Sequence, residues 1–459
     1  MALTRQPAAG AGPARFFCDA ACLGGETAEA DVLLTVDGGA FTAVEPGAAR
    51  PPDAVHLEGL TLPGFANAHS HAFHRVLRGR TERPGTFWTW REQMYAVAAV
   101  LDPERYRRLA RATFAEMALT GITAVGEFHY LHHPPGGGRY RDPNEMTAAL
   151  FAAAGEAGVR ITVLDACYLE NGPGRPAEGV QLRFSDGDAA SWAERAATVT
   201  PPQGARTGAA IHSARAVPPG AARAVAGWAA DRDVPLHFHL SEQHAENEEV
   251  SAAYGASPAE LLGAAGALRK SATAVHATHV GPAGTAAVGA AAAGVCMCPT
   301  TERALADGIG PAAALAAAGS PVSLGTDSHA LIDPFEEMRA LELDQRLATG
   351  KRGHFSPGQL VHAAAAAGHA AIGWPEAGRI AEGCLADLVT VSLASPRLAG
   401  VTQDHLVEHT VFAASPADIT GVVISGRPVA RGGRHLLIGD VAAALRSAIA
   451  EVTDALDDL

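Results

Sequence analysis

Lysine is almost absent from this sequence. Only Lys270 and Lys351 occur, so 33 of the 35 basic residues are arginines. Cysteine is also scarce, and its six positions show none of the spacings typical of a disulfide framework. Free thiols suit a reducing compartment, so we expect a cytoplasmic protein. No unbroken apolar run reaches the ~18 residues of a membrane span, and Met1 to Phe17 lacks the apolar core of a signal peptide.

Positive charge is in deficit as well. The 35 basic residues stand against 49 acidic ones, a formal net charge of −14. A net acidic surface argues against nucleic acid or an anionic membrane as the main partner. Apolar residues make up 48% of the chain and charged residues 18%, which excludes wholesale disorder and allows a large core. A length of 459 residues accommodates an α/β barrel of about 250 residues and a smaller domain.

Short runs rich in Val and Ile recur, each followed by polar residues and then by a helical pattern. We predict strands at Leu60–Ala66, Gly121–Phe128, Gly158–Cys167, Gly208–His212, Val234–Leu240, Thr273–His276, Gly294–Cys298 and Pro321–Leu324. Several intervening segments begin with Pro, which is a signal for a helix start. These helices are expected at Pro103–Thr120, Pro143–Ala157, Pro218–Asp231, Pro258–Ala267, Pro282–Ala293 and Pro311–Ala318. Eight alternating units predict an α/β fold, a (β/α)₈ TIM barrel over residues 60–377.

The two flanks of this region resemble one another. Residues 1–59 and 378–435 contain short β-like segments separated by glycine turns. We therefore predict one small β-sandwich-like domain assembled from both chain ends. Residues 436–459 are predicted to form a helical C-terminal tail.

Imidazole and carboxylate side chains gather at the C-terminal ends of the predicted strands, where barrel enzymes place their active sites. His69 and His71 end the first strand, and residues two apart in an extended segment project to the same side, so both can bind one metal ion. Three later strand ends carry comparable motifs: His237 to Glu242, His276 to His279 and Asp327 to His329. A single His-x-His motif is weak, but four in order rarely arise by chance. Zn²⁺ suits these ligands, and Fe²⁺ or Mn²⁺ are also compatible with them.

These motifs resemble the amidohydrolase superfamily over essentially the whole chain, from Leu62-Pro63-Gly64-Phe65 to Gly383-Cys384-Leu385-Ala386-Asp387. The resemblance implies a metal held by His69, His71, His239 and Asp327. It also implies that Asp327 takes a proton from the attacking water, His276 orients that water and Glu242 protonates the leaving nitrogen. Binuclear members bridge their metals with a lysine on the fourth strand. Here that strand ends in His212 and contains no lysine, so we expect one metal ion per chain.

Four longer motifs carry a narrower resemblance. Residues 70–73, 87–92, 127–133 and 212–215 are similar to those of the formimidoylglutamate deiminases, which hydrolyse N-formimino-L-glutamate to N-formyl-L-glutamate and ammonia in histidine degradation. The resemblance implies a small dicarboxylate substrate, and guanidinium groups suit carboxylates. At position 74 the family pattern has glutamine where this chain has histidine. The implied substrate contacts are His74, Arg91, Tyr130, His212 and Arg215.

Alternatives stay open at this point. A mononuclear deaminase acting on a purine, pyrimidine or triazine would need the same metal ligands, although a neutral heterocycle does not call for two arginines. A non-catalytic scaffold is disfavoured by the complete ligand set. We also expect a homodimer. Other conspicuous side chains are assigned packing, loop or structural roles: Trp88, Trp90, His129, His132, His133, His237, His279, Cys296 and Cys298.

Overall fold

The computed structural model describes residues 13–458. Most of the segment from Met1 to Phe17, for which the sequence predicts no signal peptide, lies outside the described residues. Eight parallel strands form one sheet in the order β12-β11-β10-β9-β8-β7-β6-β5. A bridge between Ser70 and Asp327 joins the first strand to the last and closes the ring. The predicted TIM barrel is therefore confirmed. Its strands are β5 (Phe65–Ser70), β6 (Ile122–His129), β7 (Arg160–Cys167), β8 (Ala205–Ser213), β9 (Leu236–Leu240), β10 (Ala272–His276), β11 (Gly294–Met297) and β12 (Val322–Leu324).

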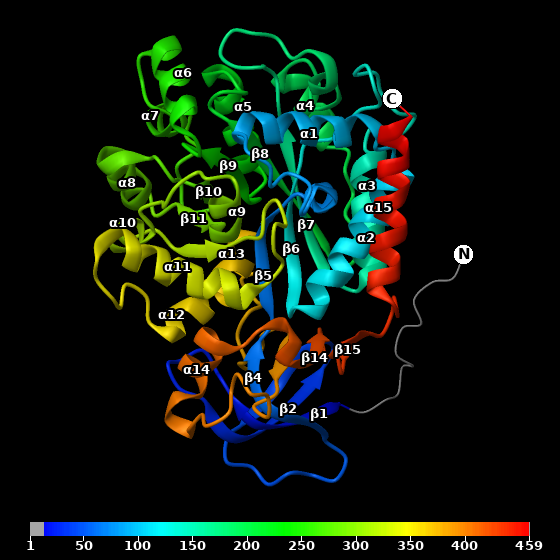
Figure 1. Ribbon diagram of the computed structural model, residues 1–459, viewed down its shortest axis with the longest axis vertical. Coiled ribbons are helices and arrows are strands. Elements are labelled where there is room, and N and C mark those ends of the chain that lie inside the picture. The colour runs from blue at the N-terminus through cyan, green and yellow to red at the C-terminus, as the bar shows by residue number, and fades with distance from the viewer. Residues whose placement is uncertain (1–12, 459) are drawn as a thin grey trace.

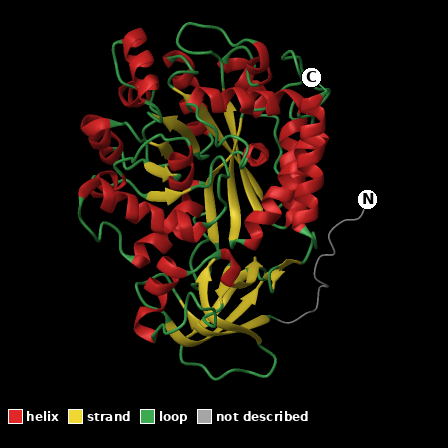
Figure 2. Cartoon of the chain, in the orientation of Figure 1, coloured by secondary structure: helices red, strands yellow, loops and turns green. Residues whose placement is uncertain are grey.

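Helices surround this barrel (Figures 1 and 2). The six predicted helices are present, and further helices add to them. Asp102 caps the first predicted helix by accepting from the backbone of Arg105, with Pro103 at its first position. The helices before the C-terminal tail are α1 (Phe87–Val100), α2 (Pro103–Leu119), α3 (Glu145–Ala157), α4 (Ala189–Ala196), α5 (Pro219–Asp231), α6 (His244–Tyr254), α7 (Pro258–Ala264), α8 (Gly281–Ala290), α9 (Pro299–Ala304), α10 (Ala312–Ala317), α11 (Pro334–Thr349), α12 (Pro357–His362), α13 (Gly368–Ala371) and α14 (Leu406–Ala413).

The two chain ends build a second sheet of eight strands, ordered β16-β15-β14-β13-β4-β1-β2-β3. It lies below the barrel in Figure 1, beside the N-terminal end of β5. The C-terminal ends of the barrel strands therefore lie at the opposite end of the barrel, away from this sheet. The strands of this second sheet are β1 (Ala14–Ala21), β2 (Glu29–Asp37), β3 (Ala40–Glu45), β4 (Val55–Pro63), β13 (Leu388–Val391), β14 (Ile419–Ile424), β15 (Arg427–Arg431) and β16 (Arg434–His435).

One predicted strand is wrong. Leu60–Ala66 is divided between the two sheets, because β4 ends at Pro63 and β5 begins at Phe65. Proline has no backbone N–H to continue a ladder. The intervening Gly64 approaches its neighbours so closely that a Cβ there would lie 2.6 Å from the Thr123 side chain. The chain therefore crosses from the terminal sheet into the barrel at this glycine.

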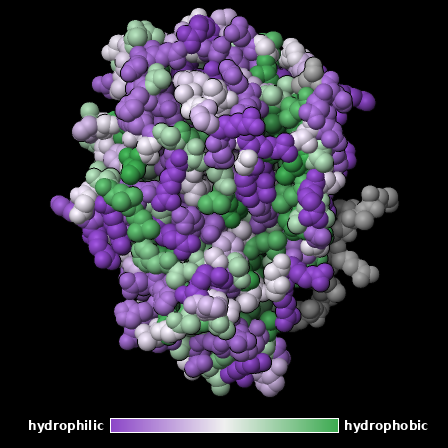
Figure 3. All heavy atoms as spheres, in the orientation of Figure 1, coloured by the Kyte–Doolittle hydropathy of each residue, from purple (hydrophilic) through white to green (hydrophobic). Residues whose placement is uncertain are grey.

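The C-terminal tail forms α15 (Val441–Asp457), which lies along α2 in Figure 1. Asp440 caps this helix, which buries its own Val441, Leu445, Ala448 and Val452. The face drawn in Figure 3 mixes hydrophilic and apolar residues. Among the described residues, no helix combines the length and apolar character needed to cross a membrane.

A buried ion pair joins the barrel to the terminal sheet. The Arg160 guanidinium on β7 donates two hydrogen bonds to Asp387, one of them 3.0 Å long. Both side chains are almost completely buried. Asp387 also accepts from the backbone of Ser425 at 2.9 Å, which ties three segments together.

Asp387→Asn keeps the side-chain shape but leaves Arg160 as an uncompensated buried charge. We expect the free energy of unfolding to fall by about 3–5 kcal/mol, as measured in urea titrations. The matched control is Asp53→Asn, which removes a 3.5 Å pair with Arg15 at the surface. Exposed pairs contribute about 0–1 kcal/mol, so equal losses in the two variants would contradict this role for Asp387.

Candidate active site

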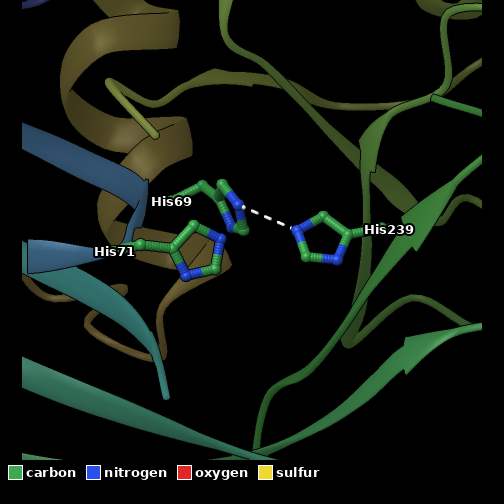
Figure 4. Close-up of side chains that lie close together, drawn as sticks. All are labelled: His69, His71 and His239. Atoms are coloured by element: carbon green, nitrogen blue, oxygen red, sulfur yellow. Dashed lines mark hydrogen bonds between the residues drawn. The ribbon is translucent and has the colours of Figure 1, made fainter. Parts of the chain in front are cut away.

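The metal-ligand candidates meet at the C-terminal end of the barrel. His69 on β5 and His71, which directly follows this strand, project toward His239 on β9 (Figure 4). The Nε2 atoms of His69 and His239 are 3.2 Å apart, and Asp327 Oδ1 lies 3.5 Å from Nε2 of both His69 and His71. Three imidazoles and a carboxylate, all buried, converge on one point. This donor set fits a divalent transition metal such as zinc.

Backbone carbonyls orient two of these rings. His71 donates from Nδ1 to the Phe128 carbonyl and His239 donates from Nδ1 to the His212 carbonyl, each at a distance of 2.8 Å. This arrangement leaves the Nε2 lone pairs free for a metal, a pattern common among metal-binding histidines. Burial and the neighbouring imidazoles hold the pKa values of His69, His71 and His239 well below the usual range. The rings are therefore neutral, as ligands must be.

Backbone strain is concentrated around this point. His276 and Asp327 have φ values of 67° and 42°, in the left-handed region that non-glycine residues seldom adopt. Ser241, next to Glu242, has a φ of 50°. Such conformations persist only where the surrounding structure enforces them, and they are typical of active sites. Here they turn the chain at the strand ends that carry the predicted catalytic residues.

Glu242 and His276 lie side by side. His276 Nε2 is 3.8 Å from Glu242 Oε1 and 3.7 Å from Asp327 Oδ2. Burial, together with the Asp327 and Glu246 carboxylates, raises the pKa of Glu242 to about 7, although His276 opposes the shift. Burial disfavours protonated His276, but Glu242, Glu302 and Asp327 outweigh this and hold its pKa well above the usual value. A carboxyl group with a pKa near 7 is suited to exchanging protons at neutral pH.

One pocket contains nearly all of the predicted site residues. His69 is the exception, because it lies fully buried at the floor. The predicted residues that line the pocket are His71, His74, Arg91, Tyr130, His212, Arg215, His239, Glu242, His276 and Asp327.

The two predicted arginines lie around one tryptophan. The Arg91 guanidinium stands 4.5 Å above the Trp88 ring and that of Arg215 lies 5.7 Å from it. Within residues 13–458 neither arginine forms an ion pair, and Arg91 Nε is buried without a partner. The other three predicted contacts, His74, Tyr130 and His212, also line the pocket, and His74 Nε2 pairs with the Tyr130 hydroxyl at 2.9 Å. Trp88 therefore supports the arginines, and the pocket has cationic groups available for an anion.

Comparisons with known proteins identify the family of this chain. The model of the amidohydrolase family matches residues 60–429. The chain belongs to the amidohydrolase family. It is 38% identical over 401 residues to a formimidoylglutamate deiminase of Pseudomonas aeruginosa, covering 84% of this chain and 88% of that protein. A 5-methylthioadenosine/S-adenosylhomocysteine deaminase of Pelotomaculum thermopropionicum is 28% identical over 389 residues, 84% of each protein.

A solved structure supports the same family assignment. An amidohydrolase from Brucella melitensis superimposes with a TM-score of 0.89 at 33% identity, covering 96% of this chain and all of that one. Amidohydrolases are metal-dependent hydrolases, in keeping with the convergent ligand set described above.

Several other histidines of this amidohydrolase lie apart from the metal-ligand candidates. His237 Nε2 bonds the Ala371 carbonyl at 2.8 Å, and His279 Nε2 bonds the Asp307 carbonyl at 2.7 Å. His129, His132 and His133 are buried near an Arg195–Asp165–Asp186 ion cluster. No described group of three potential metal ligands includes them. These contacts support the packing, loop or structural roles predicted for these histidines.

The sequence interpretation missed a carboxylate that supports the ligand loop. Glu127 is completely buried at the end of β6 and accepts from Ser70 Oγ and from the backbone N–H of Ala72, each at 2.6 Å. It holds the chain on both sides of His71. Glu302 was also missed, although it lies 3.4 Å from His276 Nδ1. Glu127 stands in the motif of residues 127–133, so the sequence contained a signal for it. Nothing in the sequence distinguishes Glu302 from other glutamates.

Proposed function

We propose that this amidohydrolase hydrolyses the formimino group of N-formimino-L-glutamate, giving N-formyl-L-glutamate and ammonia. The observation that carries the proposal is that Arg91 and Arg215, neither of which has an ion-pair partner in the described part of the chain, line the same pocket as the metal-ligand candidates. They provide charge and planar hydrogen-bond donors for a dicarboxylate. The similarity to formimidoylglutamate deiminase of Pseudomonas aeruginosa supports the same substrate.

His69, His71, His239 and Asp327 would hold one metal ion, taken here as Zn²⁺. When bound, such an ion lowers the pKa of water and polarises the group under attack. Asp327 lies on the pocket wall, where its free oxygen can accept a proton from the attacking water. His276, 3.7 Å from Asp327, orients that water and stabilises charge on the tetrahedral carbon. The positions of these side chains around the predicted metal site support these roles.

Glu242 completes the proton transfers. Water adds across the C=N bond, so the carbon gains a hydroxyl group. Glu242 then delivers a proton to the departing nitrogen. The C–N bond breaks, ammonia leaves and the carbon retains a carbonyl oxygen. With a pKa near 7, Glu242 can accept and donate a proton in each turnover. Arg91, Arg215, Tyr130, His74 and His212 hold the remainder of the substrate.

An ammonia-release screen tests this substrate against the alternative. The aromatic pocket wall of Tyr130, Tyr168 and Phe184, together with the deaminase relatives, favours a heterocycle as the second candidate. The screen compares N-formimino-L-glutamate with guanine, cytosine and S-adenosylhomocysteine. Preference for the formimino compound supports the proposal, and preference for a ring would replace it.

Metal removal gives a further prediction. Chelation should abolish activity and leave the barrel folded, because the large apolar core does not depend on one ion. Reloading with Zn²⁺ should restore activity at about one ion per chain, as measured by elemental analysis and circular dichroism. Full activity only at two ions per chain would contradict the mononuclear site. The homodimer and the cytoplasmic location expected from the sequence stay predictions.

A further inference from the structure

Tyr168 is a pocket residue to which the sequence interpretation gave no role. It directly follows β7, the third barrel strand, and its side chain is 2% exposed. The side chain lines the same pocket as the metal ligands and the two arginines. Its hydroxyl has no hydrogen-bond partner among the described residues. Buried polar atoms are nearly always paired, so an unpaired hydroxyl in a pocket wall calls for an explanation.

Packing fixes the ring of Tyr168. It meets His212 edge to face, with centroids 4.7 Å apart and an interplanar angle of 77°. It meets Phe184 in the same manner at 5.5 Å. Since the ring is held from two sides, its hydroxyl is a preorganised donor and ordering it on binding costs little.

The hydroxyl groups of the two neighbouring pocket tyrosines, unlike that of Tyr168, form hydrogen bonds. The Tyr130 hydroxyl pairs with His74 at 2.9 Å, and the Tyr95 hydroxyl accepts from Gln181 at 3.0 Å. Only Tyr168 among these three pocket tyrosines lacks a partner within residues 13–458. Burial and the nearby Tyr95 hydroxyl raise its pKa well above the ordinary value, against the effect of Arg215 and Arg91, so the phenol stays protonated and can donate.

We infer that Tyr168 donates a hydrogen bond to the substrate carboxylate that Arg215 binds. It supplies directionality without adding a third positive charge to the pocket. Tyr168 is thus a specificity-determining residue for carboxylate-bearing formimino compounds. The inference rests on the proposed function, because it needs a carboxylate beside the arginines.

The test compares Tyr168→Phe with the wild type on three substrates. These are N-formimino-L-glutamate and its two mono-amides, in which either the α- or the γ-carboxylate is neutral. For the dicarboxylate we expect kcat/KM to fall by ~10–100-fold, mainly through KM. For the amide that lacks the contacted carboxylate, the loss should be under about threefold, because the strong hydrogen bond to a charged acceptor is already absent. Tyr254→Phe, which removes a hydroxyl outside the pocket, is the matched control.

A double-mutant cycle tests the shared contact. If Tyr168 and Arg215 bind one carboxylate, the loss caused by Tyr168→Phe should shrink to under about threefold in the Arg215→Met background. Equal losses on all three substrates, or no loss on any, would overturn the inference while leaving the proposed function intact. A wild-type enzyme that is inactive on N-formimino-L-glutamate but active on a heterocycle would instead overturn the proposed function.

Discussion

Glu242→Gln is expected to lower kcat by ~10²–10⁴ while the metal content stays at the wild-type level. Glutamine keeps the shape of the side chain and its place 3.8 Å from His276, but it cannot accept and release a proton. Steady-state kinetics and elemental analysis of the same preparation measure both quantities. The large effect is expected because no other described carboxylate lies as close to His276 Nε2 except Asp327, which is a ligand candidate.

The control for this variant is Glu248→Gln on the exposed side of α6, which should leave kcat unchanged. A Glu242→Gln protein with nearly wild-type kcat would remove Glu242 from the mechanism. Loss of the metal in that variant would instead identify Glu242 as a ligand. The metal measurement therefore separates the two roles.

Arg215→Met should lower kcat/KM for N-formimino-L-glutamate by ~10–10³-fold. Arg215 is 9% exposed and lines the pocket, where its charge has no described ion-pair partner. A hydrogen bond to a charged group contributes ~1.5–3 kcal/mol, and an unpaired buried charge on the substrate side adds to the loss. Methionine retains much of the packing against Trp88. The loss should be far smaller for a formimino compound without the contacted carboxylate.

Arg175→Met is the control, since this largely exposed arginine is already paired with Glu249. Its kcat/KM should stay close to that of the wild type. If Arg215→Met lost the same factor on substrates with and without the carboxylate, Arg215 would have only a structural role. The dicarboxylate proposal would then lose its main support.

The barrel could be predicted from the sequence because its signals are local. Val- and Ile-rich runs mark β6 and β7, and Pro103 and Pro258 stand at the starts of α2 and α7. The boundary between β4 and β5 at Gly64 could not be predicted, because it depends on a contact with Thr123 far along the chain. Apolar residues continue across this glycine, so the two strands look like one in sequence.

The candidate site, like the fold, could be predicted only in part from the sequence. The metal-ligand candidates could be found because a barrel places every strand end on one face. Glu302 and Tyr168 could not be found from such a rule. Glu302 contacts His276 from α9. The position of Tyr168 becomes informative only once its hydroxyl, which has no hydrogen-bond partner among the described residues, is found in the same pocket as Arg215. Such contacts depend on side-chain geometry between elements.

One measurement tests the central claim most directly: identification of the products when metal-loaded protein acts on N-formimino-L-glutamate. Proton NMR would follow the formimino C–H signal, and an enzymatic assay would quantify ammonia in the same reaction. The account predicts that N-formyl-L-glutamate and ammonia appear in equal amounts, because Glu242 protonates the terminal nitrogen. Formation of glutamate and formamide would contradict it, because the other C–N bond would then have been cleaved.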